Sequence, residues 1–172
     1  MNYNPSTIAR IGDLVNGIRV DTTALAAATY MLIGPTQTEL FNIHGRCKIH
    51  ELFGEVSGAA FSTHACVAYY TYTSTSPVIA VGPLSAVGAS MSDLAIGERI
   101  AWIGGAVGTA TVLTATPGIT DVERIPQVVG VDGGVGTIGI NTATASITGA
   151  GIVTFSICYT PLSDNAYIEA AL

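Results

Sequence analysis

The stretch Gly151-Ile-Val-Thr-Phe-Ser-Ile-Cys-Tyr-Thr160 has the most regular alternation of side chains in the protein. Successive side chains of a β-strand point to opposite faces of a sheet, so every second residue shares a face. One face would carry Ile152, Thr154, Ser156 and Cys158, and the other Val153, Phe155, Ile157 and Tyr159. Because the second face is the more apolar, we expect it to line a hydrophobic core.

Short runs rich in Val, Ile, Thr and Tyr recur along the chain, and turn-forming residues interrupt them about every eight to twelve residues. Strands are predicted at 39–43, 47–56, 63–73, 77–81, 99–103, 109–114, 125–131, 136–141, 151–159 and 166–171. Residues 24–33 fit a further strand that could begin as one helical turn, and 83–95 a short helix or ordered loop. Asp132-Gly133-Gly134 predicts a tight turn, because glycine accepts positive φ. The pattern indicates an all-β fold, a single jelly-roll-like sandwich or barrel whose strand order is not visible in the sequence.

The chain has 172 residues, which fits one domain of about 100–200 residues. Its first part, 1–23, holds isolated apolar side chains between proline, glycine and asparagine, and these cannot build a core alone. We therefore predict an extended N-terminal arm over 1–23, packed on the domain or on a neighbour, and a β-domain over 24–172. Residues predicted to contact a partner or a second subunit are Ile8, Ile11, Leu14, Val15, Ile18 and Trp102.

Charged residues make up only 10% of the chain and hydrophobic residues 49%, whereas an ordinary soluble domain has about 25% charged residues. A largely neutral surface favours contact with copies of the chain or with a protein partner, because little charge is desolvated. The net charge of −6 argues against nucleic-acid binding. The longest apolar stretch, 100–113, is shorter than the ~20 residues of a membrane helix. We expect a soluble member of an assembly, without a secretory signal.

The segment Leu40-Phe-Asn-Ile-His-Gly-Arg-Cys-Lys-Ile-His-Glu-Leu-Phe-Gly-Glu-Val56 raises the question of a metal site. Its residues His44, Cys47 and His50, followed by His64 and Cys66, are of the types that bind zinc. In a strand, however, Cys47 would face away from both His44 and His50. A β-hairpin with its turn at 44–46, where Gly45 supplies the turn conformation, is the favoured interpretation. The odd number of cysteines indicates buried thiols in a reducing compartment.

Other chemistry finds little support in the sequence. All three histidines lie within 44–64 and no Gly-x-Ser-x-Gly motif is present, so we predict no enzyme. The Gly-Gly pairs are followed by no lysine, so no phosphate loop and no cofactor is expected. Glu51 and Glu55 would share a strand face, as solvated residues or partners of Arg46 or Arg99. Trp102 with nearby tyrosines could form a sugar platform, although packing in the core or at an interface is favoured.

A series of motifs runs from Leu40 to the end of the chain. Leu40-Phe41-Asn42-Ile43-His44-Gly45 is followed by Ile49-His50-Glu51-Leu52-Phe53-Gly54-Glu55-Val56, and later by Gly136-Thr137-Ile138, Thr148-Gly149 and Tyr159-Thr160-Pro161-Leu162. In this order the motifs resemble the head decoration, or cement, proteins of tailed bacteriophages. The resemblance covers about the last three-quarters of the chain, is weak through 75–130, and carries over no catalytic residue. His44, Cys47 and His50 depart from the pattern.

The resemblance implies a structural virion protein, made in the bacterial cytoplasm, that sits on the outer face of the head and clamps neighbouring major capsid subunits. Its partners would be the major capsid protein and itself, as a homotrimer, with no nucleic acid and no membrane. One alternative is a phage tail, baseplate or fibre module that binds carbohydrate through Trp102. A second alternative is a small metal-binding protein that uses the histidine and cysteine cluster.

Overall fold

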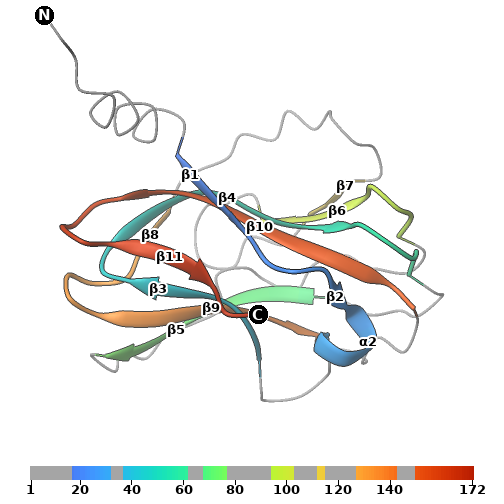
Figure 1. Ribbon diagram of the computed structural model, residues 1–172, viewed down its shortest axis with the longest axis horizontal. Coiled ribbons are helices and arrows are strands. Elements are labelled where there is room, and N and C mark those ends of the chain that lie inside the picture. Colours follow the sequence, from blue (N-terminus) through green and yellow to red (C-terminus); the bar gives the residue numbers. More distant parts are fainter. Residues whose placement is uncertain are drawn as a thin grey trace, which may run out of the picture.

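The computed structural model describes residues 17–31, 37–61, 68–76, 94–102, 112–114, 127–142 and 150–172, with the backbone alone at 68–69, 75–76, 102 and 112–114. Two antiparallel sheets pack face to face, with the core between them (Figure 1). The fold is therefore a β-sandwich, as the sequence predicts, and not a closed barrel. No helix among the described residues has the length and apolar character needed to cross a membrane.

The larger sheet has seven strands, in the order β1-β10-β4-β6-β7, with β2 beside β10 and β8 beside β4. Its strands are β1 (Ile18–Asp21), β2 (Leu25–Ala26), β4 (Cys47–Val56), β6 (Arg99–Trp102), β7 (Val112–Thr114), β8 (Gln127–Val129) and β10 (Ile152–Pro161). The smaller sheet has four strands in the order β11-β3-β9-β5. These are β3 (Thr38–His44), β5 (Ala68–Ser76), β9 (Val135–Thr142) and β11 (Tyr167–Ala170). One helical turn, α2 (Ala27–Tyr30), follows β2, so the strand predicted over 24–33 forms only at its start and the helical turn that the alanine run allowed replaces it over 27–30.

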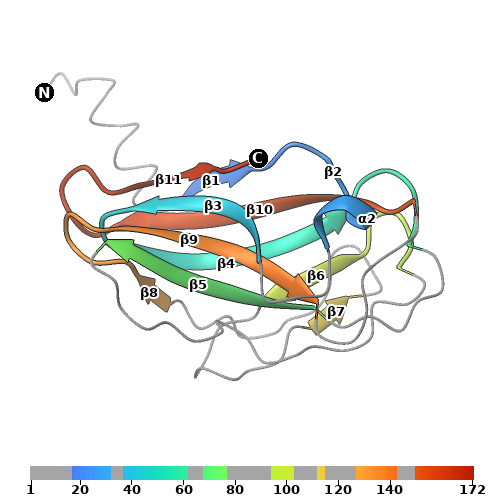
Figure 2. The same ribbon diagram turned by 90° about the horizontal axis from the view of Figure 1, so that it is seen from below.

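Consecutive strands repeatedly change sheets. β3 and β9 pair in the smaller sheet, while β4 and β10, which follow them in the chain, pair in the larger one. Figure 2 shows the two layers from the side on which β5 and β9 lie in front. Such exchange between two sheets is typical of jelly-roll sandwiches.

The predicted hairpin over 41–56 is wrong, although both of its strands form. β3 pairs with β9 and β11, and β4 pairs with β10, β6 and β8, so β3 and β4 belong to different sheets. Gly45 has the expected positive φ of 71°, but the turn carries the chain across the sandwich. The physical reason is burial: Ile43 and Ile49 are both 0% exposed and cover the core from opposite sheets.

The core contains the apolar face predicted for residues 151–160. Val153, Phe155, Ile157 and Tyr159 are at most 3% exposed, which confirms that face assignment. Tyr70 and Phe155 meet edge to face with ring centroids 6.4 Å apart. The core is therefore filled from both sheets, by aromatic side chains among others.

A β-bulge interrupts the pairing of β4 with β10. Cys158 lies opposite Glu51 and Tyr159 opposite Ile49, so His50 is the extra residue on β4. The bulge changes which residues face the core: Ile49 faces inward before it and Leu52 after it, both fully buried. His50 and Glu51 are consequently both partly exposed.

The segment predicted as an arm ends in a strand of the larger sheet. β1 pairs with β10, with Ile18 opposite Tyr159 and Asp21 opposite Ser156. Ile18 packs against the core. Residues 1–16, the predicted strand at 77–81 and most of the predicted helix or loop at 83–95 lie outside the described residues.

Candidate functional site

Three loops meet at one end of the sandwich, on the left in Figures 1 and 2. They are residues 45–46 between β3 and β4, 130–134 between β8 and β9, and 162–166 between β10 and β11. We call them, with the strand residues beside them, the loop end. The Gly45 amide donates to the Gly134 carbonyl at 2.8 Å, and the Leu162 amide to the Arg46 carbonyl at 2.8 Å. These bonds tie loops from both sheets together.

Further contacts fix the shape of the loop end. The Arg46 amide donates to Ser163 Oγ at 3.0 Å, and the Gly134 amide donates to the Val131 carbonyl at 2.9 Å. The latter bond closes the tight turn that the sequence predicts at 132–134. At Gly130, with φ of 79°, a Cβ would lie 2.0 Å from the Gly45 carbonyl oxygen. The loop end is thus a pre-formed surface, because its backbones touch.

Two pairs of ionisable side chains lie close together at the loop end. Arg46 Nε lies 3.6 Å from Asp132 Oδ1, and His44 Nε2 lies 3.3 Å from Glu169 Oε1. Except for His44, these side chains are about half exposed, so each pair contributes at most about 1 kcal/mol. Asp164, in the 162–166 loop, is also exposed, so the loop end carries acidic groups beside Arg46 and no basic cluster.

Apolar side chains are exposed around the same end. Tyr167 lies opposite His44, and His44 opposite Val135, so the three form one outward row across the smaller sheet. The His44 and Tyr167 rings are stacked, 4.2 Å apart at 12°. Tyr167 is 44% exposed and Val135 37%. Leu162 and Val128 add 41% and 56% exposed side chains beside the loops. A pre-formed surface on which exposed apolar groups are mixed with polar ones is typical of protein contact sites.

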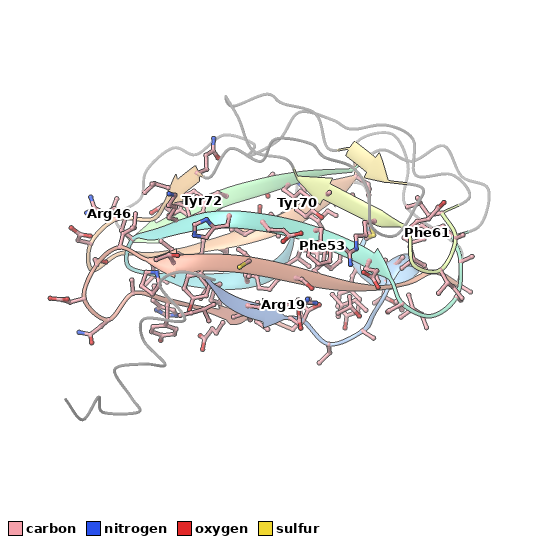
Figure 3. All side chains as sticks on the ribbon, turned by 90° about the horizontal axis from the view of Figure 1, so that it is seen from above. Arg19, Arg46, Phe53, Phe61, Tyr70 and Tyr72 are labelled. Carbon is pink, nitrogen blue, oxygen red and sulfur yellow. The ribbon has the colours of Figure 1, made fainter. Side chains whose placement is uncertain are left out.

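A second cluster lies on the outer face of the larger sheet, around Phe53. The guanidinium carbons of Arg99 and Arg19 lie 4.5 and 5.7 Å from the centre of its ring, leaving Phe53 only 6% exposed. Arg99 also pairs with Glu55 at 2.7 Å, which confirms one predicted partner of that carboxylate. Figure 3 labels Arg19 and Phe53 in this part of the sheet.

The second arginine of this cluster is also paired. Arg19 Nε donates to Asp21 Oδ1 at 2.8 Å, and its Nη2 to Ser156 Oγ at 3.0 Å. Burial raises the pKa of Asp21, but hydrogen bonds to Ser156 and Arg19 outweigh it and leave the pKa below its usual value. Since both arginines have carboxylate partners and cover the ring, this cluster stabilises the sheet.

The described residues that the sequence raised as candidate metal ligands lie in three different environments. Cys47 is fully buried in the core, where burial raises the pKa of its thiol to about 11. His44 lies on the outer face of the smaller sheet. His50 lies on the outer face of the larger one, with Nε2 2.8 Å from Thr160 Oγ1. No group of three or more His, Cys, Asp or Glu residues in the described part of the chain could hold a metal ion.

The other predicted site residues are placed only in part. His64, Cys66, Ile8, Ile11, Leu14 and Val15 lie outside the described residues. The backbone of Trp102 pairs with Leu52 in the larger sheet. Sequence reasoning missed Tyr167, Val135 and Leu162. A signal was present for two of them, because Val135 follows the predicted turn and Leu162 follows Pro161, and both are apolar residues beside chain reversals.

Comparison with protein-family models, curated proteins and solved structures finds no match to this chain. The resemblance carried by the motifs from Leu40 onward therefore stays a prediction. The chemistry of the described surface is the remaining guide to function. That surface holds a rigid, partly apolar loop end and paired charges.

Proposed function

We propose that this chain is a structural protein of a bacteriophage particle, a decoration protein that binds the outer surface of the head and holds neighbouring major capsid subunits together. The observation that carries the proposal is the pairing of charge within the chain. Arg19, Arg46 and Arg99 each lie within 4 Å of a carboxylate of the same chain. Because these three arginines are paired within the chain and only 10% of its residues are charged, a protein partner meets few free cations that must be desolvated, while the chain keeps a net charge of −6.

The placement of the resembling motifs gives further support. Residues 40–44 and 136–138 lie on β3 and β9, which pair with each other. Residues 49–56 and 159–161 lie on β4 and β10, which also pair. Motifs far apart in the sequence thus form the centre of both sheets, as expected if they specify a shared fold.

The proposed mechanism is stabilisation of the shell by preferential binding. A protein that binds the expanded shell and not its dissociated subunits stabilises the shell by mass action, in proportion to the logarithm of its free concentration. The proposal includes a homotrimer on the capsid and an N-terminal arm that reaches across subunit boundaries, namely the part of the predicted arm 1–23 that precedes β1. Closed symmetric oligomers are the usual arrangement for such chains.

Quantitative mass spectrometry of purified particles tests the proposal, after heads have been separated from tails. We expect the chain to travel with heads in a copy number comparable to that of the major capsid protein. A few copies found only with tails would contradict the capsid assignment, and so would absence from particles. Native mass spectrometry of the isolated chain measures whether it is a trimer.

A further inference from the structure

We propose that the loop end is the surface through which the chain docks on the capsid, with the major capsid protein as its partner. This inference rests on the proposed function and adds the location of the contact. Its first support is the distribution of exposed apolar groups. The large exposed hydrophobic residues of the described chain are Ile96, Val128, Val135, Leu162, Tyr167 and Leu172. Four of these six, from Val128 to Tyr167, surround the three loops.

The second support is rigidity. Docking costs less conformational entropy when the contact surface is already ordered. At the loop end, hydrogen bonds join Gly45 to Gly134, Leu162 to Arg46 and Arg46 to Ser163, so each loop is braced by another. The stacking of His44 on Tyr167 holds the exposed tyrosine ring in one orientation.

The third support is the position from which the N-terminal segment leaves the sheet. β1 begins at Ile18, opposite Tyr159, only two residues before β10 ends at Pro161 beside the loops. Gly17 has φ of 75°, and a Cβ there would lie 2.7 Å from Cys158 Sγ. Gly17, the first described residue, therefore lies next to the loop end in a conformation that favours glycine.

The N-terminal segment is long enough to share the partner that the loop end contacts. Sixteen residues precede Gly17, and an extended chain of that length spans at most about 55 Å. A segment attached at this end can follow the same partner surface without first wrapping around the sandwich.

The partner's chemistry follows from the charges of the loop end. Arg46 faces Asp132, His44 lies beside Glu169, and Asp164 is exposed in the same loops, so the described surface has no basic cluster. This favours a folded protein surface with apolar groups and a polar rim over a polyanion or an anionic membrane. The rigid outer face of a capsid shell meets that description.

The opposite end of the sandwich provides a matched control. Ile96 is 64% exposed, and the next residue, Gly97, donates its amide to the Val56 carbonyl at 2.8 Å. β4 runs from Cys47 at the loop end to Val56, a strand of ten residues that spans about 30 Å. A charge placed at Ile96 is therefore remote from the proposed contact.

The test measures binding of the full-length chain to purified expanded capsids that lack it, by co-sedimentation over a range of concentrations. Leu162→Glu and Tyr167→Ser are compared with Ile96→Glu, after thermal unfolding has shown that each variant is folded. We expect the loop-end variants to raise Kd about tenfold or more and Ile96→Glu to change Kd by less than about twofold. Tyr167→Ser adds no charge, so it keeps the test informative if Leu162→Glu does not fold.

Other outcomes overturn the inference in recognisable ways. If the unmodified chain binds capsids and both loop-end variants bind as well as it does, the docking surface lies elsewhere while the proposed function stands. If Ile96→Glu weakens binding as strongly, the contact is not specific to the loop end. If the unmodified chain does not bind capsids, the proposed function itself fails. If the variants instead dissociate an oligomer in native mass spectrometry and leave capsid binding unchanged, the loop end joins copies of this chain.

Discussion

The hydroxyl of Tyr70, on β5 of the smaller sheet, donates a 2.8 Å hydrogen bond to the backbone carbonyl of Ile100, on β6 of the larger sheet. Tyr70 is fully buried, and burial raises the pKa of its hydroxyl far above the usual value. The phenol therefore stays neutral and acts as a donor. This bond joins the two sheets on the side of the sandwich away from β1 and β11, where main-chain pairing cannot connect them (Figure 3 labels Tyr70).

Replacing Tyr70 with phenylalanine keeps the ring and removes this link. We expect the free energy of unfolding to fall by about 1–2 kcal/mol, because the Ile100 carbonyl loses a buried donor. Urea unfolding followed by circular dichroism measures the change. Tyr72→Phe is the control, since no hydrogen bond of the Tyr72 hydroxyl is found in the described part of the chain. Equal losses of unfolding free energy in the two variants would show that the hydrogen bond between Tyr70 and Ile100 does not itself stabilise the protein.

Two glycines of the 130–134 loop allow the cost of a steric clash to be measured separately from the cost of a left-handed backbone conformation. Gly130 and Gly133 both have positive φ, 79° and 70°, but only Gly130 has an atom within 4 Å of an added Cβ. Gly133→Ala should destabilise the protein by about 1–2 kcal/mol, the cost of the left-handed conformation for a residue with a Cβ. Gly130→Ala should cost about 3 kcal/mol or more, because the Gly45 carbonyl must also move. Thermal unfolding of both variants gives the comparison, and similar melting temperatures would contradict it.

The thiol of Cys47 should be inert in the folded protein. It is fully buried and its pKa is raised to about 11, so at pH 8 only about 0.1% would be thiolate. In a Cys66→Ser, Cys158→Ser variant, we expect a thiol-specific disulfide reagent to react only after denaturant is added. The matched variant that retains Cys158 alone should react faster without denaturant, because that side chain is half-buried. Rapid reaction of Cys47 under native conditions would mean that the core opens locally.

His50 should make the protein less stable in mild acid. Burial, and then the charge of Lys48, lower the pKa of His50 below its usual 6.5. The unfolded chain therefore takes up a proton at a higher pH than the folded one. The stabilising contribution is complete above about pH 6.5 and is lost as the pH falls through the folded-state pKa.

Urea unfolding of the unmodified chain and of His50→Gln at pH 8 and pH 5 tests this dependence. We expect the unmodified chain to lose more of its free energy of unfolding between the two pH values than His50→Gln does. His64 and His44 are present in both proteins, so their contributions cancel. An identical pH dependence in the variant would place the acid sensitivity elsewhere.

Local sequence features predicted much of the sandwich. Alternation placed the inner face of β10, from Val153 to Tyr159, correctly, and turn chemistry placed the reversal at Gly133. Even the bulge on β4 leaves a trace, because Ile49 and Leu52 are three residues apart and break the period of two. The failure at 41–56 has a clear cause. A glycine with positive φ between two apolar strands suits a hairpin and a crossing between sheets equally well, and only the distant partners β9 and β10 distinguish them.

The sequence by itself determined the strands, their core-facing sides and the low charge of the surface, because these depend on spacing and composition over a few residues. Strand alternation already separated Cys47, which enters the core, from His44 and His50, but tertiary structure alone decided that the two histidines occupy opposite outer faces. It also placed Tyr167 beside His44 and Val135, and joined loops whose residues lie more than a hundred positions apart. Strand pairing is a competition among all exposed backbone groups of the chain, so its outcome depends on long-range burial that no local pattern contains.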